Sequence, residues 1–339
     1  MLNDRNPLVA IQFRLRKSMP TRVLTMLAAA AVLVSAQAPA QAADSLKVAI
    51  SQRGFWDSSF LEFALKEGFL RDANLDVEFF YTEGGGSTLQ TLTSGSVDVA
   101  MSNGLLGALG AYSKGAPIRA ISAQMTGAHE LFWYVKSDSR IRSLKEADGK
   151  TIAFSAPGSS SNLILLSLLK QAGSKAKPVA AGGLPATLTQ VMTGQIDIGW
   201  AVPPFALREL QEGRIAIVAR ARDATELKDQ TIRVNVAGVD ALARKREAIT
   251  RLMQVYDKAI AWSYAHPKAI DYFAETAKVP REIARQAVEE FYPREALQIG
   301  EIRGLDLTLK DALQYKYISS LMTPKDVAGL IDIVHKPPR

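Results

Sequence analysis

Cysteine is missing from all 339 positions of the sequence. Its absence excludes disulfide bonds, thiolate metal sites, a cysteine nucleophile and a lipid-modified N-terminal cysteine. Histidine is scarce as well: His129, His266 and His335 are isolated in the sequence and lack the spacing of metal ligands. Only His129, which follows a predicted hinge, lies near a candidate functional region. We therefore expect no metal site and no cofactor.

The sequence also lacks a hydrophobic run long enough to cross a membrane. The apolar run Val23–Val34 has 12 residues, fewer than a membrane-spanning helix needs. It follows a basic segment and precedes small residues at Ala40 and Ala42, a pattern typical of a cleaved secretory signal. We predict that residues 1–42 are a signal peptide, cleaved near Ala42 and Ala43, and that the cysteine-free mature chain is periplasmic. The alternative is an N-terminal amphipathic or anchoring helix.

The chain has only a small excess of positive charge once the predicted signal peptide is left out. Residues 1–42 contain five basic residues and one acidic residue, so the net charge of the remainder is +3 rather than +7. No cluster of lysine and arginine with interleaved aromatic residues is present, and we expect no nucleic-acid partner. The basic segment is long for a signal peptide, which leaves open whether translation begins at Met1 or at Met19.

One sequence unit occurs twice, about a hundred residues apart. The first copy, Thr82–Asn103, has the pattern of loop, helix, turn and strand, and the second copy, Ala180–Val202, aligns with it without a gap. Two similar units suggest two similar lobes. Asp98 and Asp197 occupy matched turns before the last strand of each unit, and we interpret them as structural.

Strand and helix patterns alternate along the chain, which predicts an α/β fold. Such folds have mixed, mostly parallel sheets with helices on both faces, and their ligands bind at the carboxyl ends of the strands. The pattern changes after Gln124 and returns near Asn235, so we predict two hinge crossings. Lobe one is predicted to comprise residues 43–125 and 226–339, and lobe two residues 126–225.

The C-terminal part of the chain, from Lys245 onward, is strongly helical in pattern. Pro267, Pro280 and Pro324 each suit the first turn of a helix. The ending from Val334 is predicted to be a loose tail.

The order and spacing of these segments resemble the periplasmic substrate-binding proteins of ABC importers. The segments that carry the resemblance are Glu83–Asn103, Ser143–Gly173 and Val191–Phe205, and the likeness covers roughly Ser45–Leu321. More narrowly, the chain is similar to the nitrate, sulfonate and taurine group, which is related to the thiamine-precursor, or NMT1-like, binding proteins.

The resemblance implies a type II clamshell of two lobes that closes on a small ligand and then docks on an ABC permease in the inner membrane. It implies a monomeric, non-enzymatic protein that delivers a small organic anion, most plausibly a sulfonate or carboxylate, while nitrate and thiamine precursors stay open as ligands. Two alternatives remain. One is an enzyme of the same fold acting on a pyrimidine or thiamine precursor, although such enzymes rely on cysteine and histidine. The other is a ligand sensor that docks on a membrane receptor.

Helix N-termini are the predicted anion-binding groups. They present unpaired N–H groups and a partial positive charge, so they can hold an anion without a buried lysine or arginine. Three helix starts face the predicted cleft: Gly85–Thr88, Ser102–Gly104 and Gly158–Ser161. For each serine the alternative is that its hydroxyl only caps its own helix.

Aromatic residues in the loops predict an apolar side to the cleft. Where the first copy of the repeat ends in Met-Ser-Asn, the second ends in Trp-Ala-Val, and this asymmetry favours an amphiphilic ligand over a bare inorganic ion. The alternative to ligand contact for the aromatic residues is ordinary packing. For Gln124 and Asn235 the alternative is that their side chains only satisfy backbone groups at the hinge. The predicted ligand-binding residues are Phe55, Trp56, Gly85, Gly86, Ser87, Ser102, Asn103, Gln124, Gly158, Ser159, Ser160, Ser161, Pro185, Trp200, Pro203 and Asn235.

Catalytic motifs are incomplete in this sequence. The glycine-rich segment after Glu83 lacks the lysine of a phosphate-binding loop. The segment Gly158–Asn162 has asparagine where a nucleophile elbow needs glycine. Since no nucleophile is paired with a base, we expect no enzymatic activity.

Overall fold

The computed structural model describes residues 42–337, and residues from Ala43 onward form one compact unit. The predicted signal peptide and both candidate start sites lie outside the described residues. Within residues 42–337, no helix is both long enough and apolar enough to cross a membrane.

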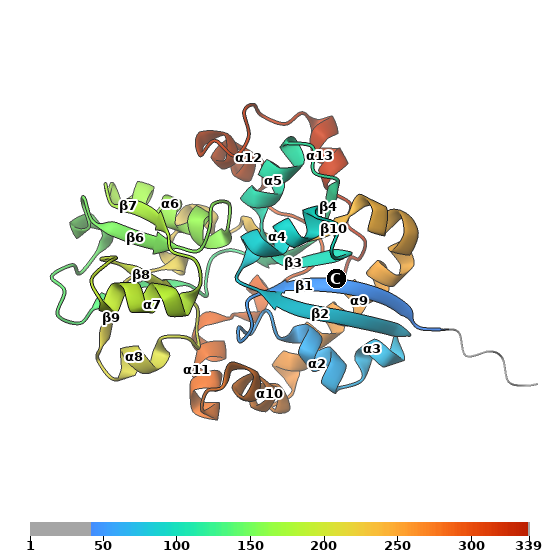
Figure 1. Cartoon of the computed structure of the whole chain (residues 1–339), viewed down its shortest axis with the longest axis horizontal. Helices are drawn as coiled ribbons and strands as arrows, with labels where there is room; N and C mark the ends of the chain where they lie inside the picture. Colours follow the sequence, from blue (N-terminus) through green and yellow to red (C-terminus); the bar gives the residue numbers. More distant parts are fainter. Residues whose placement is uncertain (1–41, 338–339) are drawn as a thin grey trace, which may run out of the picture. The chain divides into compact units, whose positions relative to one another are not determined.

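A five-stranded sheet forms the centre of lobe one, in the order β2-β1-β3-β10-β4 (Figure 1). Its strands are β1 Asp44–Ser51, β2 Leu75–Thr82, β3 Val99–Gly104, β4 Ile118–Thr126 and β10 Thr231–Gly238. Strand β1 is parallel to β2 and β3, whereas β10 is antiparallel to β3 and β4. Because β10 is the strand on which the chain returns from lobe two, the returning segment becomes an inner strand of this sheet.

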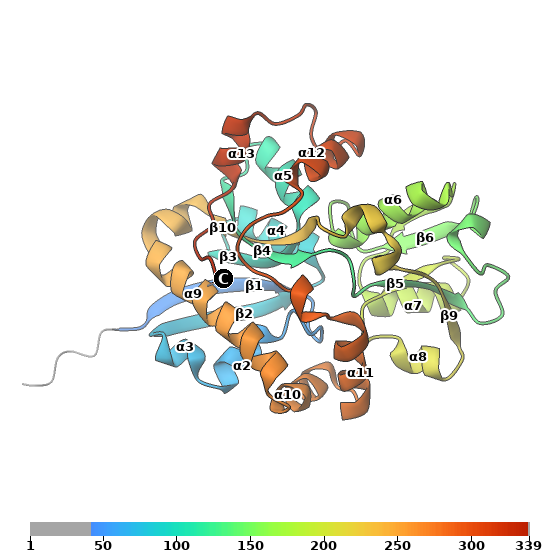
Figure 2. The same cartoon turned by 180° about the vertical axis from the view of Figure 1, so that it is seen from behind.

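Helices cover both faces of the five-stranded sheet. Helices α2, α3 and α9 pack on one face, and α4 and α5 pack on the other (Figure 2). Their bounds are α2 Phe60–Lys66, α3 Phe69–Asp72, α4 Gly85–Thr93, α5 Leu105–Ser113 and α9 Val239–Ala265. The inner strand β10 is therefore covered on both faces and is buried at every position but the last.

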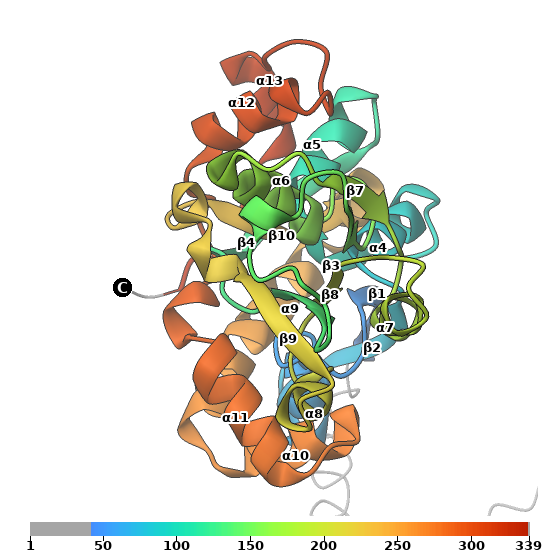
Figure 3. The ribbon, with the colours of Figure 1, turned by 90° about the vertical axis from the view of Figure 1, so that its left-hand side faces the viewer.

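Lobe two contains two smaller sheets, seen nearest the viewer in Figure 3. Strand β5 is antiparallel to β8 and β9, and β6 is parallel to β7. A bridge from Ile152 to Ile198 links the two sheets. The bounds are β5 Phe132–Lys136, β6 Thr151–Phe154, α6 Ser160–Ala172, β7 Lys177–Ala180, α7 Leu184–Met192, β8 Gly199–Ala201, α8 Leu207–Gln211 and β9 Ile215–Arg220.

The two copies of the sequence unit have the same local structure, which confirms their interpretation as a repeat. The side chain of Asp98 accepts the backbone N–H of Lys47 at 2.8 Å, and that of Asp197 accepts the N–H of Thr151 at 2.9 Å. Burial alone raises the pKa of Asp197, but the hydrogen bonds from Thr151 and the charge of Lys150 outweigh it, so the pKa is lowered. Both aspartates thus attach a turn to the neighbouring parallel strand, as expected of structural residues.

The C-terminal helices are α10 Lys268–Ala277, α11 Arg281–Phe291, α12 Leu305–Gln314 and α13 Pro324–Leu330. Pro267 and Pro280 immediately precede α10 and α11, and Pro324 begins α13, as predicted. The prediction of a loose tail is wrong for the described residues. The N–H groups of Asp332 and Val334 donate to the carbonyls of Ala120 and Ile121 at 2.9 and 3.1 Å, so the tail continues along β4.

We propose the predicted lobe boundaries as the actual ones, because β1 to β4 and β10 share one sheet while β5 to β9 form the other two. Helix α11 contacts both parts. The ring of Phe291 packs on Phe132 of β5 with centroids 6.0 Å apart, whereas α11 also packs on α10.

Candidate functional site

A loop between β6 and α6 carries consecutive serines, and each has a different local role. The Ser159 hydroxyl caps α6 by accepting the N–H of Asn162 at 3.2 Å. The Ser161 hydroxyl accepts the N–H of Ser155 at 3.0 Å and so closes the loop. The Ser160 hydroxyl instead accepts a hydrogen bond from Nε of Arg233 at 2.9 Å, which joins this loop of lobe two to β10 of lobe one.

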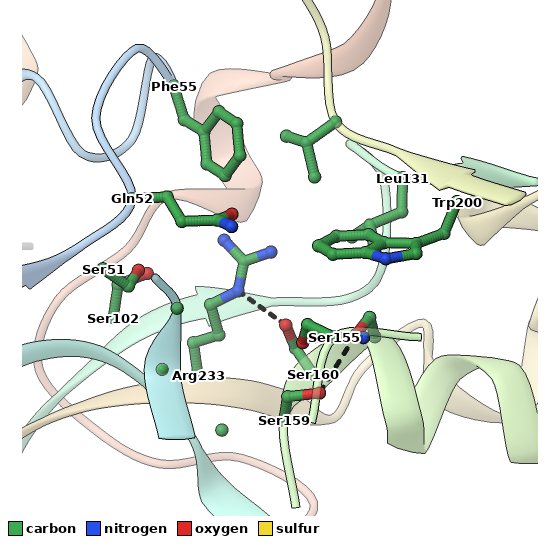
Figure 4. Close-up of a pocket in the computed structure, with 15 residues that line it drawn as sticks. Ser51, Gln52, Phe55, Ser102, Leu131, Ser155, Ser159, Ser160, Trp200 and Arg233 are labelled. Carbon is green, nitrogen blue, oxygen red and sulfur yellow. Dashed lines mark hydrogen bonds between the residues drawn. The ribbon is translucent and has the colours of Figure 1, made fainter. Parts of the chain in front are cut away.

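These serines face a pocket of about 40 Å³ to which both lobes contribute (Figure 4). The lining residues are Ser51, Gln52, Phe55, Gly84, Gly85, Ser102, Gly104, Leu131, Ser155, Ser159, Ser160, Ser161, Trp200, Val202 and Arg233.

Three helix starts contribute to this lining, as the sequence predicts. Gly84 and Gly85 begin α4, Gly104 precedes α5, and the serine loop begins α6. A Cβ atom on Gly85 would lie 3.0 Å from the carbonyl oxygen of Ser102, so a larger residue there would require α4 or the end of β3 to shift by a few tenths of an ångström.

Ser102 has a left-handed backbone conformation, with φ 62°. A residue other than glycine adopts this conformation only where its surroundings hold it. Here the buried Asn235 accepts the N–H of Ser102 at 3.1 Å, and the Ser102 hydroxyl donates to Asp57 at 3.4 Å. These contacts hold the end of β3 in the conformation in which Ser102 lines the pocket.

Arg233 is the one charged residue in the lining, and its guanidinium lies in the middle of the pocket in Figure 4. It forms ion pairs with Asp57, at 2.6 Å, and with Glu130. Asp57 also accepts Nε2 of Gln124 at 3.1 Å, and Glu130 accepts the N–H of His129 at 3.3 Å. Asp57 and Glu130 are 1% and 0% exposed, so this charged cluster is held inside the protein.

An apolar group lies on the opposite side of the pocket from the serines. It consists of Phe55, from the loop after β1, together with Leu131 and Trp200 from lobe two (Figure 4). Val202 is a further apolar residue of the lining. Nε1 of Trp200 is buried and has no hydrogen-bond partner among residues 42–337. An unsatisfied buried donor beside a pocket is a free group for a ligand acceptor.

Seven of the predicted ligand-binding residues line this pocket. They are Phe55, Gly85, Ser102, Ser159, Ser160, Ser161 and Trp200. The structure places the other nine outside the lining, namely Trp56, Gly86, Ser87, Asn103, Gln124, Gly158, Pro185, Pro203 and Asn235.

Trp56 is the clearest departure from the predicted site. It is fully buried, and its indole packs edge-on against the rings of Phe60, Phe63, Tyr264 and Phe273, with centroids 5.3 to 5.8 Å apart. The neighbouring Phe55 faces the pocket instead. Trp56 therefore anchors the loop that presents Phe55, which is the packing alternative stated for the aromatic residues.

The side-chain amides of Asn103, Gln124 and Asn235 bond to other protein groups rather than lining the pocket. Asn103, Gln124 and Asn235 are fully buried; Nδ2 of Asn103 donates to the carbonyl of Ala100, and Nδ2 of Asn235 donates to Ser122. Gln124 and Asn235 support Asp57 and Ser102 from behind the pocket rather than lining it.

The remaining predicted ligand-binding residues lie on the surface or at contacts away from the pocket lining. Ser87 and Pro185 are exposed in the first turns of α4 and α7, and the carbonyl of Pro203 accepts the hydroxyl of Tyr292 at 3.0 Å. A Cβ atom on Gly86 would lie 3.3 Å from Cβ of Ala156, which places Gly86 at a contact between the lobes.

Gly158 is also at a contact between the lobes. Its carbonyl accepts the N–H of Gly107 at 3.0 Å, and its N–H donates to the hydroxyl of Tyr317 at 2.6 Å. A Cβ atom at Gly158 would lie 2.8 Å from Cα of Gly107, so the two backbones touch because both residues are glycine.

Sequence reasoning missed eight lining residues, of which Arg233 matters most. The sequence analysis named no basic side chain among the predicted site residues, and the structure adds this one to the lining. One signal was present, because Arg233 is the single charged residue in β10, where Ile232, Val234 and Val236 are apolar. The others are Ser51, Gln52, Gly84, Gly104, Leu131, Ser155 and Val202.

Comparison with known families gives one match. The model described as "NMT1/THI5 like" matches residues 57–270, which is more than half of the chain. The chain belongs to the NMT1/THI5-like family. A search of curated proteins finds no match.

Several solved structures have the same fold. The aliphatic sulphonate-binding protein SsuA of Escherichia coli is 19% identical, with a TM-score of 0.68, over 87% of this chain and 93% of that one. The alkanesulfonate-binding SsuA of Xanthomonas axonopodis pv. citri, bound to MOPS, is 18% identical, with a TM-score of 0.70, over 85% and 97%. The nitrate-binding protein NrtA of Synechocystis PCC 6803 is 14% identical, with a TM-score of 0.66, over 85% and 86%.

These matches establish that the NMT1/THI5-like chain has the periplasmic-binding-protein fold, as the resemblance implied. At such low identities the likeness concerns the fold. The ligand has to be argued from the pocket itself.

Proposed function

We propose that this protein is the solute-binding component of an ABC importer and that it captures a small organic anion, a sulfonate or carboxylate, between its lobes. It then delivers the anion to a permease in the inner membrane. The protein acts in the periplasm as a monomer, after removal of residues 1–42. The names of its structural neighbours, which include sulfonate-binding and nitrate-binding proteins, support this role.

One observation carries the proposal: the pocket has a donor-rich side and an apolar side. Helix starts at Gly85 and Ser160 present N–H groups that have no partner within their own helices. Trp200 and Phe55 lie opposite them. An anionic head group and an organic tail would each meet matching chemistry in this arrangement.

A binding role also agrees with the chemistry of the lining. The only side chains there that titrate or act as nucleophiles are Arg233 and the serine hydroxyls. The hydroxyls of Ser102, Ser155, Ser159, Ser160 and Ser161 bond to one another, to Asp57 or to Arg233. Within residues 42–337 none of these hydroxyls contacts a histidine, and Asp57, the carboxylate that accepts the Ser102 hydroxyl, is itself held in an ion pair with Arg233. We therefore propose a binder rather than an enzyme.

A thermal-shift screen of the purified mature protein tests the proposal. We expect aliphatic sulfonates or carboxylates to raise the melting temperature by several degrees, since ligand at a hundred times its Kd stabilises a protein by about 2.7 kcal/mol. Nitrate, aromatic carboxylates and thiamine precursors complete the panel. Stabilisation by cationic compounds alone would overturn the anion assignment.

A further inference from the structure

Arg233 does not supply the pocket with a net positive charge. Nη1 of its guanidinium contacts Asp57 at 2.6 Å, a second terminal nitrogen contacts Glu130, and Nε donates to Ser160 at 2.9 Å. All three nitrogens of the guanidinium are therefore engaged before any ligand arrives.

The charges beneath the pocket consist of one cation and two carboxylates. Each carboxylate receives a hydrogen bond in addition to the ion pair, from Gln124 to Asp57 and from the His129 N–H to Glu130. One guanidinium and two carboxylates have a formal charge of −1, and a proton on one carboxyl group would bring it to zero. In neither case does it attract an anion.

The attraction for an anion must therefore come from the helix starts. The N-termini of α4 and α6 each contribute about half a positive charge at the pocket. The N-terminus of α5 is partly engaged, because the N–H of Gly107 donates to Gly158. These partial charges suit one negative charge, whereas a second would be repelled by Asp57 and Glu130 in surroundings of low dielectric constant.

We propose that Asp57 and Glu130 determine specificity by neutralising Arg233, so that the cleft selects singly charged anions such as sulfonates over doubly charged ones such as sulfate. This inference rests on the proposed function and narrows its ligand class. Arg233 then acts as a fixed hydrogen-bond donor and support for Ser160 rather than as the counter-ion of the ligand.

Titration calorimetry with ligands of matched shape tests the inference. Methanesulfonate and sulfate have nearly the same size and differ by one charge. We expect methanesulfonate to bind at least about tenfold more tightly than sulfate, which corresponds to about 1.4 kcal/mol. Methylphosphonate has the same shape and gains a second negative charge as pH rises through neutrality. Its affinity should fall over that range while that of methanesulfonate stays constant.

Substitutions test which residues are responsible. Glu130→Gln removes one negative charge with little change of shape, and it should reduce the preference for methanesulfonate over sulfate by about tenfold. Asp57→Asn should act in the same direction, and it keeps the test decisive if one of the two variants fails to fold. Glu62→Gln is the matched control, since Glu62 is buried and paired with Arg53 outside the pocket. The ratio of its affinities for methanesulfonate and sulfate should equal that of the unmodified protein.

The outcomes separate the two proposals. Equal affinities for methanesulfonate and sulfate, or an unchanged ratio in both folded variants, would overturn the specificity inference while leaving anion binding intact. If neither anion binds and compounds of another class stabilise the protein, the proposed function itself is wrong.

Discussion

At the scale of single residues, the hydroxyl of Ser160 is the one among the three consecutive serines that does not hold its own loop together. The hydroxyls of Ser159 and Ser161 bond within the loop and the first turn of α6. Ser160 accepts a hydrogen bond from Arg233, and its own proton remains available to donate into the pocket.

Alanine substitutions should separate these roles. Ser160→Ala should weaken ligand binding by about tenfold with little loss of stability, because it removes a donor to the ligand. Ser159→Ala should lower the free energy of unfolding by about 1 kcal/mol, because it removes the helix cap. Calorimetry and denaturant unfolding measure the two effects. A Ser160→Ala protein with unchanged affinity would place this hydroxyl outside the binding contacts.

At the scale of elements, the serine loop of lobe two is attached to lobe one through the segment after α12. Tyr317 donates to Oδ1 of Asn162 and accepts the N–H of Gly158, while its backbone packs on Gly110 of α5. This contact exists only when the lobes are together, so it stabilises the arrangement that encloses the pocket.

Tyr317→Phe should therefore increase the rate of ligand dissociation by about tenfold and change the association rate little, since the contact forms after the ligand has entered. Stopped-flow measurements of both rates check this. Tyr315→Phe is the matched control, because Tyr315 lies two residues earlier and takes no part in the contact. A slower association with unchanged dissociation would contradict a role in holding the lobes together.

At the scale of the whole molecule, the polar contacts between the two lobes near the pocket include those of Gly158, Ser160 and Tyr317 and the ion pair of Arg233 with Glu130. A ligand that bridges the lobes would add contacts to the enclosed arrangement alone, and it would therefore shift the population toward that arrangement.

Small-angle X-ray scattering should detect this shift. We expect the radius of gyration to decrease when a sulfonate that stabilises the protein is added at saturation. The Tyr317→Phe protein should need more ligand to reach the same compact value. An unchanged radius with demonstrated binding would mean that the ligand enters an already enclosed pocket.

The sequence by itself determined the features that depend on local pattern. Alternating strand and helix patterns, proline at helix starts and the repeated unit predicted an α/β chain with two similar lobes, because secondary structure and turns depend mainly on neighbouring residues. Glycine and serine at the helix starts likewise placed five residues that line the pocket, and aromatic residues in the loops placed Phe55 and Trp200.

Only the tertiary structure decided which distant side chains meet. Asp57, Glu130 and Arg233 lie in three separate segments, and Trp56 and Phe55 are adjacent in sequence yet face the core and the pocket, respectively. Such pairings depend on how sheets and helices pack, which no local pattern encodes. The charge of the pocket, and with it the proposed choice of ligand, follows from that packing.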